Sequence, residues 1–401
     1  MHIEYLSLTN FRNFARLELT FPNGPVLLHG ANAQGKTSLL EAIYYLATSN
    51  SPYTTADWQL INWRTENDVI PFTRISADVV TRRSPLDRIE ITLVREQNGG
   101  DARTRKDVRL NGVTKRVMDL VGQVNVVLFL PRDLSLIEGS PIERRAYMNA
   151  TLCQTDRAYC EALATFEKLL PQRNALLKRI ADKQASPQEL DFWDGQLAEQ
   201  AGVLIAGRQR LLRELETLAQ RVHLDLTGRR ETLEIEYQPN FLPTAEGDGQ
   251  LSFNTLGLDL HRELAPQDIA PQYLEGLLES RTEHIERGMT LSGPHRDELR
   301  LQINQRDVGL YGSRGQARTA VMSLKLAELY WMHEAIGEWP ILLLDEVVAE
   351  LDAERRAYLL DCIDGTTQAI LTTTDRTIFS PTFLERAASW HVVEGQISPT
   401  V

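Results

Sequence analysis

The feature that most constrains this chain is an eight-residue string placed between a strand pattern and a helical pattern. The string is Gly30-Ala31-Asn32-Ala33-Gln34-Gly35-Lys36-Thr37, which fits the spacing GxxxxGK[ST] in full. Residues 26–28 precede it as an apolar run, and residues 39–46 follow it with apolar side chains at helical spacing. Strand, glycine loop and helix in this order are the local context of a phosphate-binding loop.

The chemistry of a nucleotide phosphate explains the residue types in this string. Glycines let successive backbone N–H groups turn inward around phosphate oxygens, and a helix that starts near Lys36 adds its positive end. Lys36 would reach the β and γ phosphates, and the Thr37 hydroxyl would bind Mg²⁺. The sequence therefore predicts a nucleotide-binding loop made of Gly30, Ala31, Asn32, Ala33, Gln34, Gly35, Lys36, Thr37 and Ser38.

A second string, Ile341-Leu342-Leu343-Leu344-Asp345-Glu346, ends in two carboxylates. Its four apolar residues predict a buried parallel strand that delivers both acids to its carboxyl end. We expect Asp345 to hold the Mg²⁺ shell, and Glu346 to orient and polarise the attacking water as a catalytic residue beside Lys36. This division is reasonable because phosphoryl transfer depends mainly on positioning and charge neutralisation. An acidic helix start is the structural alternative.

Lys36 and Asp345 lie 309 positions apart, far more than a compact nucleotide-binding domain needs. Strand patterns fill the first 30 residues and then residues 70–130, whereas long helical patterns fill about residues 141–223. Alternating strands and helices resume after about Leu291. We expect an α/β head with an antiparallel β meander, split in sequence by an inserted, mainly helical lobe, with segments 1–140, 141–289 and 290–401.

Three shorter strings accompany this head. Ser313-Arg314-Gly315-Gln316 precedes a strong helical pattern from about Ala317 to Ile336, where Ser313 suits an N-cap and the helix start offers N–H groups to an anion. Ala349-Glu350-Leu351-Asp352 follows the acidic strand, and Asp352 suits the cap of the next helix. Thr372-Thr373-Thr374-Asp375 ends the last apolar strand. An ordinary cap is the alternative for Ser313 and for Asp352.

Charge and composition limit the classes of protein that remain. The 401 residues carry a formal net charge of -12, which argues against indiscriminate coating of nucleic acid. From Arg82 to Arg116, however, ten basic residues stand against five acidic ones. This predicted hairpin is either a solvated face or a phosphate-facing patch, with DNA-contact candidates Arg103, Arg105, Lys106 and Arg109.

No apolar run reaches the roughly 20 residues of a membrane-spanning helix, and the amino terminus offers no signal-peptide core. We therefore expect a cytoplasmic protein without a membrane partner. The three cysteines are odd in number and form no CxxC pair, which favours free, buried thiols.

Taken together, these strings resemble the SMC/ABC group of ATPases and, more narrowly, the RecF family. Leu8 to Phe14, Phe129 to Leu134 with Pro141 to Arg145, and Gly293-Pro294-His295-Arg296-Asp297 look like RecF family strings. The resemblance implies an ABC/SMC-like ATPase head. In it, Ser313 to Gln316 would be the signature loop that contacts the γ phosphate held by the other subunit, Asp352 would lie on the D-loop, and Thr374 would stand where the γ-phosphate sensor lies.

The resemblance also implies a function. ATP and Mg²⁺ would drive homodimerisation on gapped or junction double-stranded DNA near the nucleoid, and slow hydrolysis would release it. RecR and RecO would cooperate in loading recombinase. The alternatives are an SMC-type chromosome ATPase, which would need longer heptad-patterned arms, and an ABC transporter ATPase subunit, which the basic hairpin disfavours.

Two positions are left open by the resemblance. No clear Q-loop glutamine is present, and Gln123 is a weak candidate. His295 and Arg296 could reach nucleotide or DNA, with a plain polar loop as the alternative.

Overall fold

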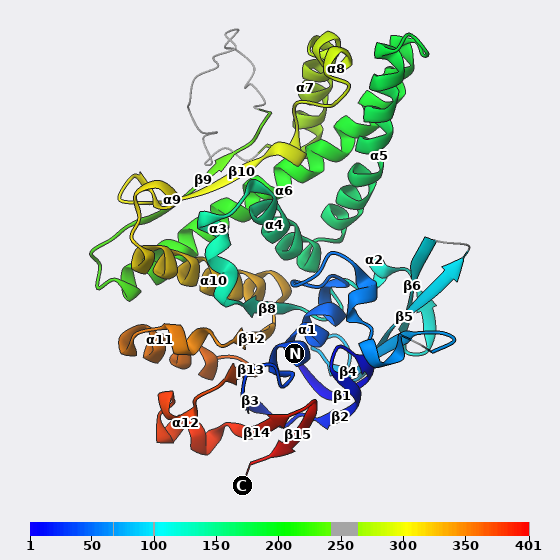
Figure 1. Ribbon diagram of the computed structural model, residues 1–401. Coiled ribbons are helices and arrows are strands. Elements are labelled where there is room, and N and C mark those ends of the chain that lie inside the picture. The colour runs from blue at the N-terminus through cyan, green and yellow to red at the C-terminus, as the bar shows by residue number, and fades with distance from the viewer. Residues whose placement is uncertain (67, 99–100, 242–263, 401) are drawn as a thin grey trace. The chain divides into compact units, whose positions relative to one another are not determined.

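The structure is a computed structural model that describes residues 1–66, 68–98, 101–241 and 264–400 (Figure 1). The chain forms two compact units, Met1–Asp133 with Glu328–Val401, and Leu134–Ala327. Helix α10 (Arg314–Ile336) contributes residues to both units. Among the described residues, no helix combines the length and the apolar character needed to cross a bilayer.

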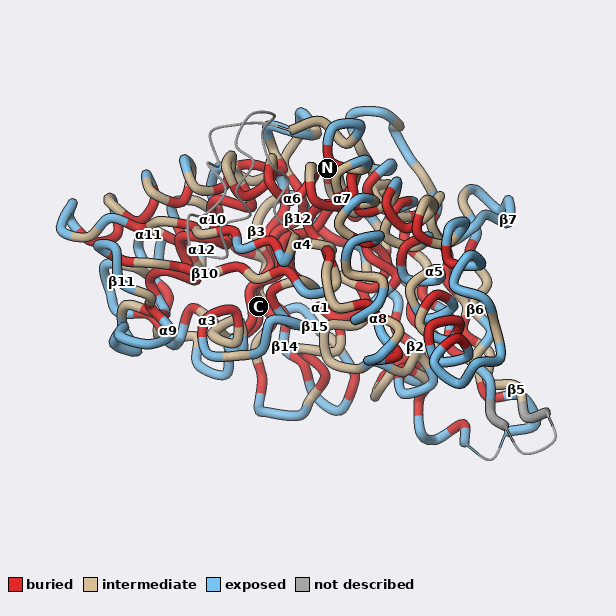
Figure 2. Tube along the Cα trace, turned by 90° about the horizontal axis from the view of Figure 1, so that it is seen from above, coloured by how far each residue is buried: buried red, intermediate tan, exposed pale blue. Residues whose placement is uncertain are grey.

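The first unit contains a six-stranded sheet in the order β15-β14-β3-β13-β12-β8. All its neighbouring pairs are parallel except β14 with β15. Its central strands are rich in Val, Ile and Leu and are buried, as Figure 2 shows for β12. The strand bounds are β3 (Gly24–His29), β8 (Val126–Phe129), β12 (Ile341–Asp345), β13 (Gln368–Thr373), β14 (Ala388–Val393) and β15 (Gln396–Pro399).

The same unit contains a second six-stranded sheet, which is antiparallel and follows the order β2-β1-β4-β5-β6-β7. This is the predicted meander. The register of β1 against β4 is irregular between Ile3 and Tyr5, which lets Ile3, Leu6 and Leu8 all be buried. The strand bounds are β1 (His2–Phe11), β2 (Phe14–Thr20), β4 (Phe72–Val80), β5 (Asp87–Asn98), β6 (Asp101–Leu110) and β7 (Val113–Lys115).

The structure describes the turn between β6 and β7 of this meander in full. Asn111 and Gly112 adopt positive φ between β6 and β7, as a two-residue hairpin turn requires. Residues 99 and 100, between β5 and β6, lie outside the described residues.

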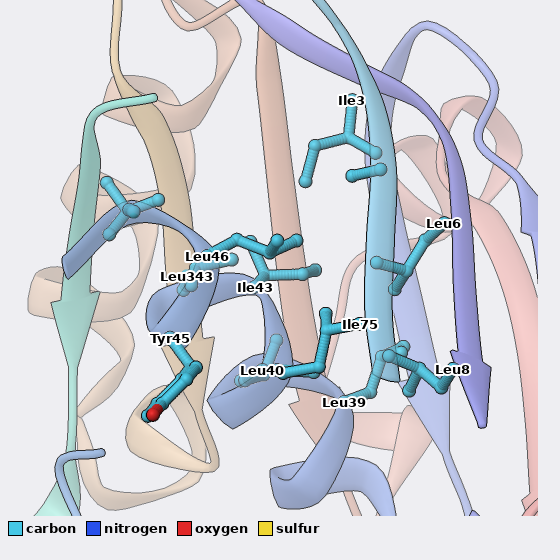
Figure 3. Close-up of a cluster of buried hydrophobic side chains, with 14 of the residues drawn as sticks. Ile3, Leu6, Leu8, Leu39, Leu40, Ile43, Tyr45, Leu46, Ile75 and Leu343 are labelled. Carbon is cyan, nitrogen blue, oxygen red and sulfur yellow. The ribbon is translucent and has the colours of Figure 1, made fainter. Parts of the chain in front are cut away.

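Helix α1 (Lys36–Thr48) packs against both sheets of the first unit. Leu39, Leu40, Ile43 and Leu46 point into one cluster with side chains of β1, β4 and β12 (Figure 3). Leu39, Leu40 and Ile43 are fully buried, so the helix that follows the glycine loop is held as part of the core. The remaining elements of this unit are short or peripheral: η1 (Asp57–Leu60), η2 (Trp63–Thr65), α2 (Val117–Leu120), η6 (Val347–Glu350), α11 (Ala353–Asp364), η7 (Arg376–Ile378) and α12 (Pro381–Arg386).

The second unit is mainly helical and confirms the predicted long helices. The long helical patterns expected over about residues 141–223 include α5 (Arg157–Ala181) and α6 (Leu190–Leu226). A three-stranded sheet, β11-β10-β9, pairs β10 (Glu298–Ile303) with β9 (Leu233–Gln238) and β11 (Arg306–Asp307). Its other elements are α3 (Ser135–Glu138), α4 (Pro141–Thr155), η4 (Pro187–Glu189), α7 (Pro266–Glu279), α8 (Arg281–Arg287), η5 (Pro294–Arg296) and α9 (Val308–Tyr311). The short η3 (Pro131–Leu134) spans the boundary, with only Leu134 in the second unit.

The units differ from the expected segments in one respect. The boundary expected at 140 lies close to the observed one after Asp133, but the boundary expected at 289 lies inside the second unit, which ends at Ala327. The reason is tertiary pairing, since β10 joins β9 across more than 60 positions of sequence. The predicted signature string at Ser313 therefore belongs to the mainly helical unit.

Candidate nucleotide-binding site

The glycine loop joins β3 to α1 as the sequence predicts. Gly30 has φ 155° and Gly35 has φ 116°, and a Cβ on Gly30 would collide with the Val392 carbonyl oxygen. A Cβ on Gly35 would lie 2.5 Å from the Asn13 amide nitrogen. Both positions therefore require glycine for conformation as well as for space.

Lys36 is buried at the base of this loop, with only 4% of its surface exposed. Its Nζ donates to the carbonyl oxygens of Gly30 at 2.9 Å and Ala31 at 3.0 Å, and lies 3.0 Å from a Glu346 carboxylate oxygen. These three partners match the three hydrogens of an ammonium group. The structure thus brings the two predicted catalytic residues into direct contact.

Asp345 lies at the carboxyl end of β12 and is 5% exposed. Its Oδ1 accepts hydrogen bonds from the hydroxyls of Thr37 at 3.0 Å and Thr372 at 2.8 Å, and its Oδ2 accepts one from Tyr53 at 2.8 Å. All three donors are neutral hydroxyls. Within the described residues, neither an ammonium nor a guanidinium group contacts this buried carboxylate, so its charge is available to a cation.

Glu346 follows at φ 55°, a left-handed conformation that is uncommon for a residue with a side chain. Its backbone N–H donates to the Thr372 hydroxyl at 2.9 Å, and the Glu346 side chain is 31% exposed. This turn of the backbone separates the two acids, because Asp345 is held in the interior while Glu346 faces the adjoining cavity. Strained backbone at such a position is typical of functional sites.

A cavity of about 400 Å³ opens over the glycine loop. Its lining comes from the loop and α1, from the β1–β2 turn, from the segment that follows α1 and from the residue that follows β12. The lining residues are Arg12, Asn13, Asn32, Ala33, Gly35, Lys36, Thr37, Ser38, Glu41, Tyr53, Trp63 and Glu346. A cavity of this size beside a phosphate-binding loop can hold a nucleotide.

Several of these lining residues were not predicted as site residues. Arg12 makes a bidentate pair with Glu41 of α1, with nitrogen–oxygen distances of 2.8 and 2.6 Å. The Asn13 amide donates to the Gln34 carbonyl oxygen at 2.9 Å, and Gly395 N–H donates to the same oxygen at 3.0 Å. The outer arm of the loop is thus fixed by two distant turns, which no local pattern indicates.

The predicted signature string lies in the second unit. Ser313, Arg314 and Gly315 are exposed at the start of α10. The Ser313 hydroxyl accepts from Gln316 N–H at 3.2 Å, and the Gln316 side chain accepts from Ser313 N–H at 2.9 Å. The predicted cap is therefore present, as a reciprocal capping box. Of the four residues, only Gln316 is partly covered, and its amide donates to Glu231 at 2.9 Å.

The other predicted site residues have mixed surroundings. Asp352 is exposed and caps α11 by accepting from Arg355 N–H at 2.9 Å, as predicted for a cap. Thr374 is exposed just after β13, whereas its neighbour Thr372 is the threonine that reaches Asp345. Gln123 precedes β8, at the opposite end of the strand from the site, and its amide donates to the Asp119 carbonyl oxygen. Gln123 is therefore in the wrong place for a Q-loop.

The basic hairpin of β5 and β6 is less uniform than its composition suggests. Arg103, Arg105 and Arg109 are exposed, and Arg105 and Arg109 are paired with Glu96 at 3.2 Å and Asp107 at 3.4 Å. Lys106 lies on the opposite face of β6. Its ammonium donates to the Ser49 carbonyl oxygen at 2.8 Å and lies 3.1 Å from Asp57, so this candidate is engaged inside the unit.

The string from Gly293 to Asp297 makes hydrogen bonds inside the second unit. Asp297 is fully buried and accepts from Arg208 at 2.7 Å, from the Tyr237 hydroxyl at 2.6 Å and from Asn240 N–H at 3.0 Å. His295 and Arg296 both lie against the Thr290 carbonyl oxygen. The contacts of this string favour the structural interpretation over nucleotide or DNA contact.

The cysteines are free, as expected, but all three are only half-buried. The burial expected of Cys153 and Cys160 is therefore only partial.

A phosphate-binding loop, a neighbouring parallel strand that ends in two acids, and a long helical insertion between them define a split ATPase head of the SMC/ABC class. The family model described as RecF/RecN/SMC N terminal domain matches residues 2–396. The head of an SMC protein, solved bound to the C-winged helix domain of ScpA, shares this fold with a TM-score of 0.51 at 13% identity, covering 100% of this chain and 97% of that one.

More similar proteins narrow the class. The DNA replication and repair protein RecF of Chloroflexus aurantiacus is 40% identical over 99% of both chains, and that of Herpetosiphon aurantiacus is 38% identical over 100% of both. The solved structure of the recombination mediator protein RecF with ATP in the RecFOR pathway matches with a TM-score of 0.83 at 27% identity, covering 100% of this chain and 98% of that one. The chain belongs to the RecF family and is an ATPase.

Proposed function

We propose that this chain is an ATP-dependent DNA-binding protein of recombinational repair, in which two heads close over two ATP molecules at gapped or junction DNA. The observation that carries the proposal is the approach of the glycine loop to both acids. Thr37 lies 3.0 Å from Asp345, and Lys36 lies 3.0 Å from Glu346. The names of its relatives, DNA replication and repair protein RecF, support the process.

Each site residue has a role in this mechanism. Lys36 holds the β and γ phosphates, to which the loop N–H groups also donate. Thr37 and Asp345 would hold Mg²⁺, which neutralises charge on the transferring phosphoryl group. The fit is chemical, since hard cations prefer oxygen ligands and Asp345 is anionic without a cationic partner in the described structure. Glu346, which faces the cavity, orients the attacking water.

The signature loop would act on the nucleotide of a second subunit. Ser313 and the start of α10 are exposed, and Leu310 and Tyr311 just before them are 71% and 74% exposed. An uncovered helix start is able to donate to an anion, and adjoining apolar side chains suit a protein contact. Asp352 would lie along the same seam, with Thr374 sensing the γ phosphate. We further propose a cytoplasmic protein that works with RecR and RecO, in keeping with the RecFOR pathway named for its structural relative.

The closed dimer is tested with Glu346→Gln, which keeps the shape of the side chain and removes its charge. Saturating ATP should trap this variant as a dimer with raised DNA affinity, measured by size-exclusion chromatography with light scattering and by fluorescence anisotropy. Glu385→Gln is the control, because Glu385 is an exposed acid on α12. A variant that stays monomeric under saturating ATP contradicts the proposal.

The assignment of Ser313 in trans has its own test. Lys36→Ala and Ser313→Arg should each abolish ATP-dependent dimerisation. A mixture of the two should recover dimers, because one composite site then has an intact Lys36 from one chain and an intact Ser313 from the other. If the mixture stays monomeric, the two strings do not serve a shared site.

A further inference from the structure

Tyr53 is an unpredicted residue that touches the candidate metal site. It lies between α1 and η1, is half-buried, and its side chain forms part of the cavity wall. Its hydroxyl donates to Asp345 Oδ2 at 2.8 Å, while Thr37 and Thr372 donate to Oδ1. Tyr53 is therefore the sole described donor on the second oxygen of this carboxylate.

The ring and backbone of Tyr53 are themselves fixed. The Arg132 guanidinium carbon lies 4.6 Å from the centre of the ring, a distance typical of a cation–π contact. Tyr53 N–H donates at 3.0 Å to the Ser51 hydroxyl, which in turn donates to Glu41 at 2.5 Å. Glu41 is the partner of Arg12. Tyr53 is thus held at its ring, at its backbone N–H and at its hydroxyl, which fixes the direction of the hydroxyl.

The Tyr53 hydroxyl has one proton to donate, and at 2.8 Å this proton is directed at Asp345 Oδ2. A donor that is locked on one carboxylate oxygen restricts rotation of that carboxylate. Outer-shell hydrogen bonds of this kind orient metal ligands and tune their affinity.

We propose that Tyr53 is a positioning residue for the divalent cation, which holds Asp345 so that Oδ1 and the Thr37 hydroxyl face the metal, with Arg132 fixing the ring. The inference rests on the proposed role of Asp345 in Mg²⁺ binding. It assigns no contact between Tyr53 and the nucleotide. Tyr53 therefore acts only on binding that depends on the cation.

The chain contains a matched control. The Tyr45 hydroxyl donates to Asp57 at 2.8 Å, and the Lys106 ammonium lies 4.9 Å from the centre of the Tyr45 ring. Tyr45 is fully buried on α1 and does not line the cavity. The pair Tyr45–Asp57 reproduces the chemistry of Tyr53–Asp345 within the same unit but at a different carboxylate.

The test measures binding of fluorescent mant-AMPPNP, which is not hydrolysed, to the full chain over a series of Mg²⁺ concentrations and in excess EDTA. In Tyr53→Phe, the Mg²⁺ concentration at half-maximal binding should rise about tenfold. Affinity in EDTA should stay within about twofold of the parent, and Tyr45→Phe should match the parent in both conditions. Mn²⁺ binding by electron paramagnetic resonance should weaken in Tyr53→Phe by a similar factor.

Arg132 gives a second, graded measurement. Arg132→Lys retains a cation over the ring and should keep most of the parental Mg²⁺ dependence, whereas Arg132→Ala should reproduce part of the Tyr53→Phe shift. The proposal is overturned if Tyr53→Phe has the parental Mg²⁺ dependence, or if it weakens binding equally in EDTA. It is also overturned if Tyr45→Phe shows the same shift. If the parent chain itself binds nucleotide without regard to Mg²⁺, the metal assignment of Asp345 fails instead.

Discussion

The exposed arginines of β6 allow a quantitative prediction about DNA binding. Arg103 is exposed without an ion pair among the described residues, and Arg105 is exposed with a single partner, Glu96, at 3.2 Å. Surface ion pairs of this kind contribute about 0–1 kcal/mol, so Arg105 can exchange Glu96 for a phosphate at little cost. We therefore expect the double variant Arg103→Gln with Arg105→Gln to lose two phosphate contacts.

The magnitude follows from counterion release. Each phosphate neutralised on duplex DNA contributes about 0.9 to the slope of log affinity against log salt concentration, so the double variant should lose about 1.8 of that slope. When salt rises from 50 to 200 mM, both proteins lose affinity for DNA, and the factor lost by the variant should be about 12 times smaller than the factor lost by the parent chain. The variant should bind more weakly at low salt and approach the parent as salt rises.

The assay is fluorescence anisotropy on labelled gapped duplex DNA with ATP in the Glu346→Gln background, at four or more salt concentrations. Lys106→Gln is the matched control, because the Lys106 ammonium is already engaged by Ser49 and Asp57. This control should keep the parental slope. An unchanged slope in the double variant would refute the assignment of this face to DNA, and a flattened slope in Lys106→Gln would refute our account of which face of β6 is available.

Three further predictions concern the loop and the second unit. Gly35→Ala should weaken mant-ATP binding by about 1–3 kcal/mol, because the added Cβ meets Asn13 and the φ of Gly35 is unfavourable for alanine. Each 1.4 kcal/mol corresponds to about a tenfold loss of affinity, and an affinity equal to that of the parent chain would contradict this geometry. Asp297→Ala should lower the free energy of unfolding in urea by about 3–5 kcal/mol, since it leaves the buried Arg208 charge unpaired; a loss under 1 kcal/mol would show that the pair is not structural. Burial and the Arg173 charge lower the pKa of His284 to about 4 in the folded protein. The stability that the folded state gains from neutral His284 is therefore present above about pH 6.5. It is lost as the pH falls toward 4, by up to about 1.4 kcal/mol per pH unit. His284→Gln should flatten this dependence in urea unfolding measured from pH 7.5 to 4.5, and an equally steep profile would argue against His284 as its source.

The parts of the site that the sequence predicts are those whose chemistry is local. The glycine loop and the acidic strand each carry strand, turn and helix signals within a dozen residues, so Lys36 and Asp345 are predictable. Tyr53 is different, because it meets Asp345 across 292 positions and nothing in its own neighbourhood indicates an acidic partner. Such contacts arise only when α1 is packed between the two sheets.

The sequence did contain signals that distinguish Lys106 from the exposed arginines and that point to Thr372. Every second residue of a strand points to the same face, so Lys106 lies on the same face as Val108. The buried apolar side chain of Val108 marks this face as the inner side of β6. That alternation separates Lys106 from Arg103, Arg105 and Arg109. Thr372 also ends a predicted parallel strand, where side chains of neighbouring strands converge. The boundary near residue 289, by contrast, depends on the pairing of β10 with β9, which no local pattern indicates.

The contacts of Lys36 link nucleotide binding to the release of Glu346 in the proposed mechanism. The Lys36 ammonium already has three partners, so a phosphate oxygen can bind it only by replacing one of them. Gly30 and Ala31 belong to the covalent frame of the loop, whereas the Glu346 side chain is 31% exposed and borders the cavity. Glu346 is therefore the partner most easily displaced. Its displacement by phosphate would free the carboxylate to orient water only after ATP is bound, which restricts hydrolysis to the loaded site.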